Sequence, residues 1–269
     1  MTFEQVKSQD QAYILPTYGR VDAALVKGRN ARAWDVDGKE YIDFTAGIGV
    51  NALGYSDPEW VQAVAGQAGA IQHLCNYYYS PENTALAQEL SQASGMAKAF
   101  FCNSGAEANE CAVKIARKYG EKRGAYKIVT LNNSFHGRTL TTLAATGQEG
   151  FHKDFLPLTE GFLYAEAGDL EGIRALLDGS VCAVMLEMVQ GEGGVIPMDE
   201  GFVKGLAQLC GEKDVLLLID EVQTGIGRTG SFYAYQGYGV KPDVVTTAKG
   251  LAGGLPMGAC LVSRSWGIS

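Results

Sequence analysis

Short apolar runs alternate with helical patterns from about residue 97 to the end of the 269-residue chain. Several of these runs are apolar throughout, which is typical of strands that are buried on both faces of a parallel sheet. Strands that alternate with covering helices indicate βαβ units, so the sequence predicts an α/β fold with a mostly parallel central sheet. The predicted strands are Tyr126 to Leu131, Val181 to Glu187, Val215 to Asp220, Asp243 to Ala248 and Ala259 to Ser263, and the predicted covering helices are Asp169 to Leu177 and Glu200 to Glu212.

The N-terminal part of the chain has a different pattern. Two short runs flank an Asp-Gly pair between Trp34 and Asp43, which predicts a hairpin outside the main sheet because Asp-Gly favours a tight turn. Two helices are predicted after it, about Pro58 to His73 and Pro81 to Ser94. Since we find no internal repeat and no low-complexity linker, the boundary that the sequence supports lies near residue 56. We therefore expect an N-terminal segment, residues 1–56, and a main domain, residues 57–269.

The composition argues against several classes of protein. The formal net charge is −8 and no run of Lys and Arg could follow a phosphate backbone, so nucleic acid is not an expected partner. No apolar stretch is long enough to cross a membrane and the first residues do not form a leader pattern, so we expect a cytoplasmic protein. The six cysteines include no C-x-x-C pair and there are only three histidines, which predicts reduced thiols and no metal site.

Three of the apolar runs end in an ionisable residue: Glu187, Asp220 and Lys249. In an open parallel sheet, ligands bind outside the carboxyl ends of the strands. Any one of these residues alone could be a cap or a solvated side chain. Because all of them follow strands of the same predicted sheet, we expect them to converge on one crevice.

A helix is predicted to begin near Gly105. Ser104 and Glu107 have capping-box spacing, and apolar residues then repeat at helical intervals as far as Tyr119. Gly105 and Ala106 are small enough to leave the first backbone N–H groups of the helix open to an anion, such as a phosphate. The alternative is an ordinary capped helix, and this motif alone does not decide between the two.

A glycine-rich motif, G-x-G-x-x-G at Gly225 to Gly230, could indicate a dinucleotide site. Such a motif must follow its strand directly and open a helix, whereas Glu221 to Thr224 intervene here and a glycine-rich aromatic segment follows. We therefore predict a loop. A dinucleotide-binding protein remains an alternative, and it would bind NAD.

A phosphate site, a strand-end carboxylate and a strand-end lysine are the groups that a pyridoxal phosphate (PLP) enzyme needs. With these features, the sequence closely resembles the class III aminotransferases from about Pro16 to Val262. The matching blocks are SGAEAN at 104–109, FHGRT at 135–139, QGEGG at 190–194, DEVQTG at 220–225, GRTG at 227–230, TAKG at 247–250 and GGLPMG at 253–258. The resemblance implies the large domain of a fold type I PLP enzyme, an amine donor and a 2-oxo acid as substrates, and a homodimer.

The resemblance also implies a role for individual residues. Gly105 and Ala106 would bind the cofactor phosphate, and Phe135 would stack on the pyridine ring. Asp220 would bind the ring nitrogen, and Gln223 would lie near the ring's phenolic oxygen. Lys249 would form a Schiff base with PLP and then act as the base that moves a proton.

Four further residues are interpreted in the same way. Arg138 resembles the residue that binds a substrate carboxylate, and the alternative is a surface arginine. Glu192 resembles the glutamate that pairs with a C-terminal arginine. Glu187 is followed by Met188 where the family usually has proline, which weakens the match, and for His136 we expect a positioning or packing role.

Within the family, residues 44–54 and 99–103 look most like members that act on N-acetylornithine in arginine biosynthesis, although Tyr55 and Asp57 replace histidines that are common there. Ornithine, succinylornithine, diaminobutyrate and 4-aminobutyrate are the alternative donors. The resemblance fades after Val262, so we expect this chain to lack the C-terminal small domain of the family. A catalytically silent chain that still binds cofactor is therefore a second hypothesis.

Overall fold

The computed structural model describes residues 1–263. The chain divides into two compact units, Met1–Tyr78 and Tyr79–Ser269. This division falls later than the boundary expected near residue 56, because helix α3 (Pro58–Ala70) groups with the N-terminal residues. Among the helices of residues 1–263, none is both long enough and apolar enough to cross a lipid bilayer.

The first unit contains an antiparallel sheet of β1 (Leu25–Arg29), β2 (Arg32–Asp35) and β3 (Glu40–Ile42). The predicted hairpin is confirmed, since β2 pairs with β3 and Gly38 in the turn has a φ of +83°. The carboxylate of Asp35 holds this turn closed by accepting a hydrogen bond from the backbone N–H of Asp37 at 3.0 Å. The helices of this unit are α1 (Phe3–Tyr13), α2 (Ala46–Gly49) and α3.

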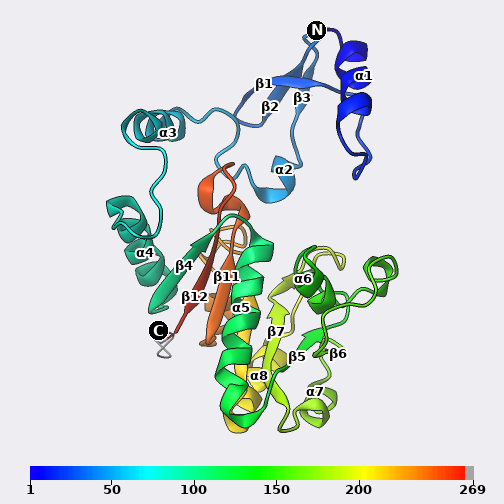
Figure 1. Cartoon of the computed structure of the whole chain (residues 1–269), viewed down its shortest axis with the longest axis vertical. Helices are drawn as coiled ribbons and strands as arrows, with labels where there is room; N and C mark the ends of the chain where they lie inside the picture. The colour runs from blue at the N-terminus through cyan, green and yellow to red at the C-terminus, as the bar shows by residue number, and fades with distance from the viewer. Residues whose placement is uncertain (264–269) are drawn as a thin grey trace. The chain divides into compact units, whose positions relative to one another are not determined.

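The second unit is built around a seven-stranded sheet with the order β4-β12-β11-β10-β7-β5-β6 (Figure 1). Strand β12 is antiparallel to both of its neighbours, and the other neighbouring pairs are parallel. The carboxyl ends of β4, β5, β7, β10 and β11 therefore lie at one edge of the sheet. The strands are β4 (Lys98–Cys102), β5 (Lys127–Leu131), β6 (Phe162–Ala165), β7 (Val181–Glu187), β10 (Leu216–Asp220), β11 (Val244–Thr247) and β12 (Gly258–Val262).

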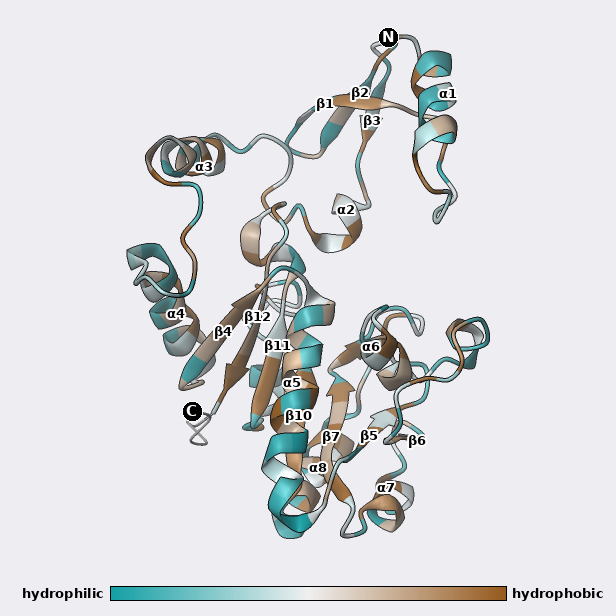
Figure 2. Cartoon of the chain, viewed as in Figure 1, coloured by the Kyte–Doolittle hydropathy of each residue, from teal (hydrophilic) through white to brown (hydrophobic). Residues whose placement is uncertain are grey.

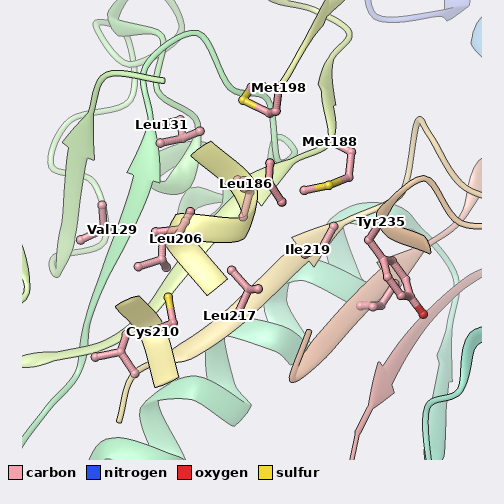
Figure 3. Packing of buried hydrophobic residues seen from close by; sticks show 14 of the residues in the cluster. Val129, Leu131, Leu186, Met188, Met198, Leu206, Cys210, Leu217, Ile219 and Tyr235 are labelled. Carbon is pink, nitrogen blue, oxygen red and sulfur yellow. The ribbon is translucent and has the colours of Figure 1, made fainter. Parts of the chain in front are cut away.

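Helices cover both faces of this sheet, with α5 (Gly105–Gly120) on one face and α8 (Glu200–Lys213) on the other (Figure 1). The strand residues alternate accordingly: Leu218 packs in the cluster below α5, whereas Leu217 packs with Leu206 of α8 (Figure 3). Apolar strands lie between helices that carry many hydrophilic residues (Figure 2). The remaining elements of this unit are α4 (Pro81–Ser94), α6 (Leu140–Ala145), α7 (Leu170–Leu176), α9 (Tyr235–Tyr238), β8 (Val189–Gln190), β9 (Ile196–Pro197) and the 3-10 helices Glu121–Arg123, Glu149–Phe151 and Lys249–Ala252.

The α/β fold and all of the predicted central strands are confirmed, with small shifts at their ends. Every residue of β7, β10 and β11 is buried, as their apolar sequences predict. Strands β4 and β6 were not predicted. Both lie at the edges of the sheet and are only partly buried, and their apolar runs, residues 99–102 and 162–165, are shorter than the runs at 181–186 and 215–219 that marked β7 and β10.

Candidate active site

The carboxyl ends of the central strands place Glu187 and Asp220 side by side. Asp220 pairs directly with Glu187 of β7 and with Thr246 of β11 in the sheet register. Side chains alternate along a strand, so Asp220 lies on the same face as Leu218, which is the face that α5 covers. Both acidic residues are only 3% exposed. Two carboxyl groups are thus held next to each other below α5.

Several groups hold the carboxylate of Asp220. Its Oδ2 accepts a hydrogen bond from Nδ2 of Asn109 at 2.8 Å and lies 2.8 Å from Nδ1 of His136. Its Oδ1 accepts a hydrogen bond from the backbone N–H of Val222 at 2.9 Å. Asn109 Nδ2 also donates to the backbone carbonyl of His136 at 2.7 Å, so helix α5 and the segment after β5 meet at this carboxylate.

The buried groups of this cluster shift one another's pKa values. Burial lowers the pKa of His136, but the hydrogen bond and negative charge of Asp220 outweigh it, so the net pKa is raised above its ordinary value. Burial is the largest effect on Glu187 and raises its pKa to about 7, although the charge of His136 and a hydrogen bond from the backbone N–H of Phe135 at 3.0 Å oppose it. The cluster therefore favours a proton on both His136 and Glu187.

Exchange of Glu187 for glutamine is expected to remove the part of the pH dependence of the unfolding free energy that comes from this carboxyl group. The pKa of Glu187 is about 7 in the folded chain and near 4.5 in the unfolded chain. The stabilisation that its protonated form gives the fold is therefore fully present below about pH 4.5 and is lost as the pH rises through about 7. Over this interval we expect the free energy of unfolding to fall by about 3 kcal/mol more in the wild type than in Glu187→Gln. Urea denaturation at closely spaced pH values, without added cofactor, measures the difference.

The matched control for this prediction is Glu89→Gln, at an exposed glutamate of α4. This control should keep the wild-type pH dependence. Identical pH profiles for the wild type and Glu187→Gln would contradict the assignment.

Helix α5 follows β4 closely, so its first turn lies at the same edge of the sheet. Ser104 caps the helix through its Oγ, which accepts a hydrogen bond from the backbone N–H of Glu107 at 3.2 Å. The predicted capping box is only half right. The carboxylate of Glu107 accepts its hydrogen bond from the backbone N–H of Asn103, one residue before the cap.

Gly105 and Ala106 bring the first turn of α5 against the other candidate segments. A Cβ atom on Gly105 would lie 2.8 Å from Cγ1 of Val222 and 3.5 Å from Cβ of Ala248, so this close approach requires glycine. A Cβ atom on Gly137 would lie 3.0 Å from Cβ of Ala106. The first N–H groups of a helix have no carbonyl one turn earlier to accept their hydrogen bonds. Free donors and a positive helix end therefore lie next to the neighbours of Asp220 and Lys249.

Lys249 begins the short 3-10 helix Lys249–Ala252 with a φ of +47°, a backbone conformation that is uncommon for lysine and indicates local strain. Burial lowers the pKa of its ammonium group. The charges of Glu192, Asp220 and Glu187 raise the pKa, but the net result stays below the ordinary value of lysine. The amine is therefore neutral, and hence nucleophilic, more readily than an exposed lysine.

The segment after β5 places Phe135 and Arg138 close together. The guanidinium carbon of Arg138 lies 5.8 Å from the ring centroid of Phe135 and 5.1 Å from that of Phe151. The two rings meet edge to face, with centroids 5.9 Å apart. These cation–π contacts orient the planar guanidinium group, and Arg138 remains exposed to solvent. Its N–H groups are thus available to a carboxylate.

Gln223 and Glu192 come from different motifs and are linked by a hydrogen bond. Nε2 of Gln223 donates to Oε1 of Glu192 at 3.3 Å. Glu192 lies in the turn between β8 and β9, which pair as a short antiparallel ribbon. A Cβ atom on Gly191 would lie 2.7 Å from Oε1 of Gln223, so the small residue lets this turn approach Gln223 closely.

The glycine-rich segment at residues 225–230 forms turns, and no helix begins directly after it, which confirms the predicted loop. Glu221 fastens the start of this loop: its buried carboxylate accepts hydrogen bonds from Thr224 Oγ1 at 2.5 Å and from the backbone N–H of Tyr235 at 2.8 Å. In residues 1–263, no group of three or more His, Cys, Asp or Glu side chains is arranged to hold a metal ion.

Asn109 and Phe151 belong to this arrangement but were not identified from the sequence. Asn109 gives a weak signal, because it is a polar residue on the buried stripe of α5, one turn after Gly105 and beside Ala108 and Ala112. Phe151 gives none, since its contact with Arg138 depends on how the chain returns after α6.

The donor set fits PLP. An anionic phosphate suits the free N–H groups at the start of α5, where the side chain of Val222 leaves no space for a Cβ atom on Gly105. A pyridine nitrogen suits the buried carboxylate of Asp220, and an aldehyde requires an amine that is readily neutral, as in Lys249.

Comparison with known proteins defines the family. Residues 14–266 match the family model described as Aminotransferase class-III. The chain therefore belongs to the class-III aminotransferases, a family whose cofactor is PLP.

Individual relatives agree with this assignment. The acetylornithine aminotransferase of Haemophilus ducreyi is 51% identical over 267 residues, which are 98% of this chain and 68% of that protein. The structure of N-acetylornithine aminotransferase from Stenotrophomonas maltophilia K279a is 41% identical, with a TM-score of 0.80 over 96% of this chain and 65% of that one. An ornithine aminotransferase structure from Toxoplasma gondii, which has PLP at partial occupancy in its active site, is 32% identical, with a TM-score of 0.92 over 97% of this chain and 63% of that one. The chain thus spans about two thirds of the length of these relatives.

Proposed function

We propose that this chain takes part in the PLP-dependent transfer of the terminal amino group of N2-acetyl-L-ornithine to 2-oxoglutarate, which gives N-acetylglutamate 5-semialdehyde and glutamate. The observation that carries the choice of donor is the 51% identity to a relative named acetylornithine aminotransferase. The reaction belongs to arginine biosynthesis. We propose that the chain acts there as a homodimer in the cytoplasm.

The proposed cofactor site consists of residues from several strand ends. The backbone N–H groups of Gly105 and Ala106 would bind the phosphate, and the ring of Phe135 would stack on the pyridine. Asp220 would bind the pyridine nitrogen and keep it protonated, and Gln223 would lie near the phenolic oxygen. When bound, PLP supplies an electron sink that lets a proton leave the carbon atom bearing the amino group.

The network around Asp220 supports this role. A carboxylate that must hold a proton on a ring nitrogen has to stay in one orientation, and Asn109, Val222 and His136 fix both of its oxygen atoms. Because the pKa of His136 is raised, its Nδ1 is favoured as a hydrogen-bond donor to Asp220. We therefore propose that His136 and Asn109 position Asp220.

Lys249 has two proposed tasks. Its Nζ would hold the cofactor covalently. As a free amine, Nζ would accept the proton from the substrate carbon and donate it again, a task that a pKa below that of an exposed lysine favours.

Arg138 is proposed to bind the carboxylate of each substrate, and Glu192 to help the site alternate between a donor and a dicarboxylate acceptor. Replacing Arg138 with lysine removes the planar pair of donors, which is worth about 1.5–3 kcal/mol for a charged hydrogen-bonded pair. We expect KM for both substrates to rise about 10–100-fold with a smaller change in kcat. Steady-state kinetics measure this. Arg174→Lys, at an exposed arginine of α7, is the control, and a change in kcat alone would argue against carboxylate binding.

The experiment that tests the function compares donors. Purified chain is incubated with PLP and 2-oxoglutarate, and glutamate formation is measured with acetylornithine, ornithine, succinylornithine, diaminobutyrate or 4-aminobutyrate. The highest kcat/KM is expected for acetylornithine, and failure to use it while another donor reacts would replace the proposed substrate. If the chain binds PLP, as seen by its visible absorbance, but turns over no donor, the catalytically silent alternative holds.

A further inference from the structure

The chain returns from α6 to β6 through residues 146–161, and this segment carries the second ring that packs on Arg138 (Figure 1). Phe151 ends the 3-10 helix Glu149–Phe151, and its ring centroid is 5.1 Å from the guanidinium carbon of Arg138. The ring of Phe135 is farther away, at 5.8 Å. Since Phe135 is also proposed to stack on the cofactor, Phe151 is the ring that is left to orient the guanidinium group.

The turn that carries Phe151 is anchored on both sides of the ring. Before it, Nε2 of Gln148 donates a hydrogen bond to the backbone carbonyl of Ser134 at 2.9 Å. Within the turn, the backbone N–H of Phe151 donates to the carbonyl of Gln148 at 3.1 Å. After it, the imidazole of His152 contacts the end of α6. The position of the Phe151 ring therefore depends on the two side chains that anchor its turn.

His152 binds two backbone carbonyls at once. Its Nε2 lies 2.7 Å from the carbonyl oxygen of Thr146 and 2.9 Å from that of Leu143. Carbonyl oxygens only accept hydrogen bonds, so Nε2 must carry a hydrogen and donate it to both. The imidazole also packs beside the ring of Tyr164 in β6, with centroids 6.0 Å apart. The residue next to Phe151 is thus fastened to α6 and to the edge of the sheet.

We propose that His152 is a positioning residue for the substrate carboxylate, which acts through Phe151 on Arg138. This role rests on the proposed function, in which Arg138 binds that carboxylate. The imidazole holds the turn, the turn holds the Phe151 ring beside the guanidinium group, and the guanidinium group presents two parallel N–H donors to the carboxylate oxygens. Without the anchor, Arg138 samples more orientations and binds a carboxylate more weakly.

The test measures carboxylate binding at Arg138 without turnover. The full chain is loaded with PLP and treated with phenylglyoxal, which modifies arginine side chains, at increasing concentrations of glutarate, a dicarboxylate without an oxo group. Peptide mass spectrometry follows the modification of Arg138, which glutarate should prevent in the wild type. In His152→Ala, the glutarate concentration that gives half protection should rise about 3–10-fold, as expected for the loss of one hydrogen-bonded anchor.

Three variants make the result specific. His152→Gln keeps an N–H donor at about the position of Nε2 and should restore protection close to the wild-type level. Phe151→Leu removes the ring but keeps the histidine, and it should weaken protection as His152→Ala does. Lys153→Ala, at the exposed next residue, should behave as the wild type. Circular dichroism shows whether each variant is folded.

The possible failures have different meanings. Equal protection of the wild type and folded His152→Ala would overturn the positioning role, as would unchanged protection in folded Phe151→Leu or no recovery in His152→Gln. If glutarate does not protect Arg138 even in the wild type, the carboxylate-binding role of Arg138 in the proposed function is wrong, and the positioning role is wrong with it.

Discussion

Replacement of Lys249 by alanine is expected to abolish covalent attachment of PLP to the chain. The wild type, incubated with PLP and reduced with borohydride, should gain the mass of one reduced cofactor on the peptide that contains Lys249, because its amine is desolvated and readily neutral. Lys249→Ala offers no amine at this position. If the chain turns over substrate, the loss of the proton-transferring base should lower kcat by about 10²–10⁴-fold.

Mass spectrometry of the reduced protein measures the first effect without any need for turnover. The matched control is Lys153→Ala, at an exposed lysine in the segment after α6, which should be labelled like the wild type. Labelling of Lys249→Ala at the wild-type level, on another lysine, would falsify the assignment of the cofactor lysine. Equal labelling of many exposed lysines would also contradict the assignment of Lys249 as the cofactor lysine.

Replacement of Asp220 by alanine is expected to cause a large loss of stability, even without cofactor. The carboxylate is 3% exposed and lies 2.8 Å from Nδ1 of a fully buried His136. Removal of one partner of such a buried pair leaves the other uncompensated and costs about 3–5 kcal/mol of the free energy of unfolding. It also leaves Nδ2 of Asn109 without one of its acceptors.

Urea denaturation measures this loss, and the double variant Asp220→Ala with His136→Ala separates its causes. If the loss comes from an uncompensated histidine, the double variant should be less destabilised than the sum of the two single variants. The control is Lys204→Ala, which breaks the exposed ion pair with Glu200 on α8 and should have little effect. An Asp220→Ala chain as stable as the control would show that the buried network contributes nothing.

The local pattern of hydrophobic residues was sufficient to predict most of the fold of the second unit. Continuous apolar runs marked β7 and β10, and strand β7 and helix α4 begin and end at the predicted residues. Edge strand β4 was missed because it is only partly buried and its apolar run, residues 99–102, is short. The sequence placed a boundary near residue 56, where the pattern of hydrophobic positions changes. In the structure, the two compact units meet after Tyr78.

For the candidate site, the sequence by itself determined which chemical groups follow the strands: a lysine, an aspartate and a helix start without bulky side chains. These are local properties, because strand periodicity and capping residues act over a few neighbours. Only the tertiary structure decided that Asp220 pairs with Glu187, that Asn109 and His136 hold its carboxylate, and that Phe151 packs on Arg138. Such contacts join residues far apart in the chain. They depend on strand order, on register and on which face of α5 meets the sheet, and none of these is encoded in the spacing of hydrophobic residues within one segment.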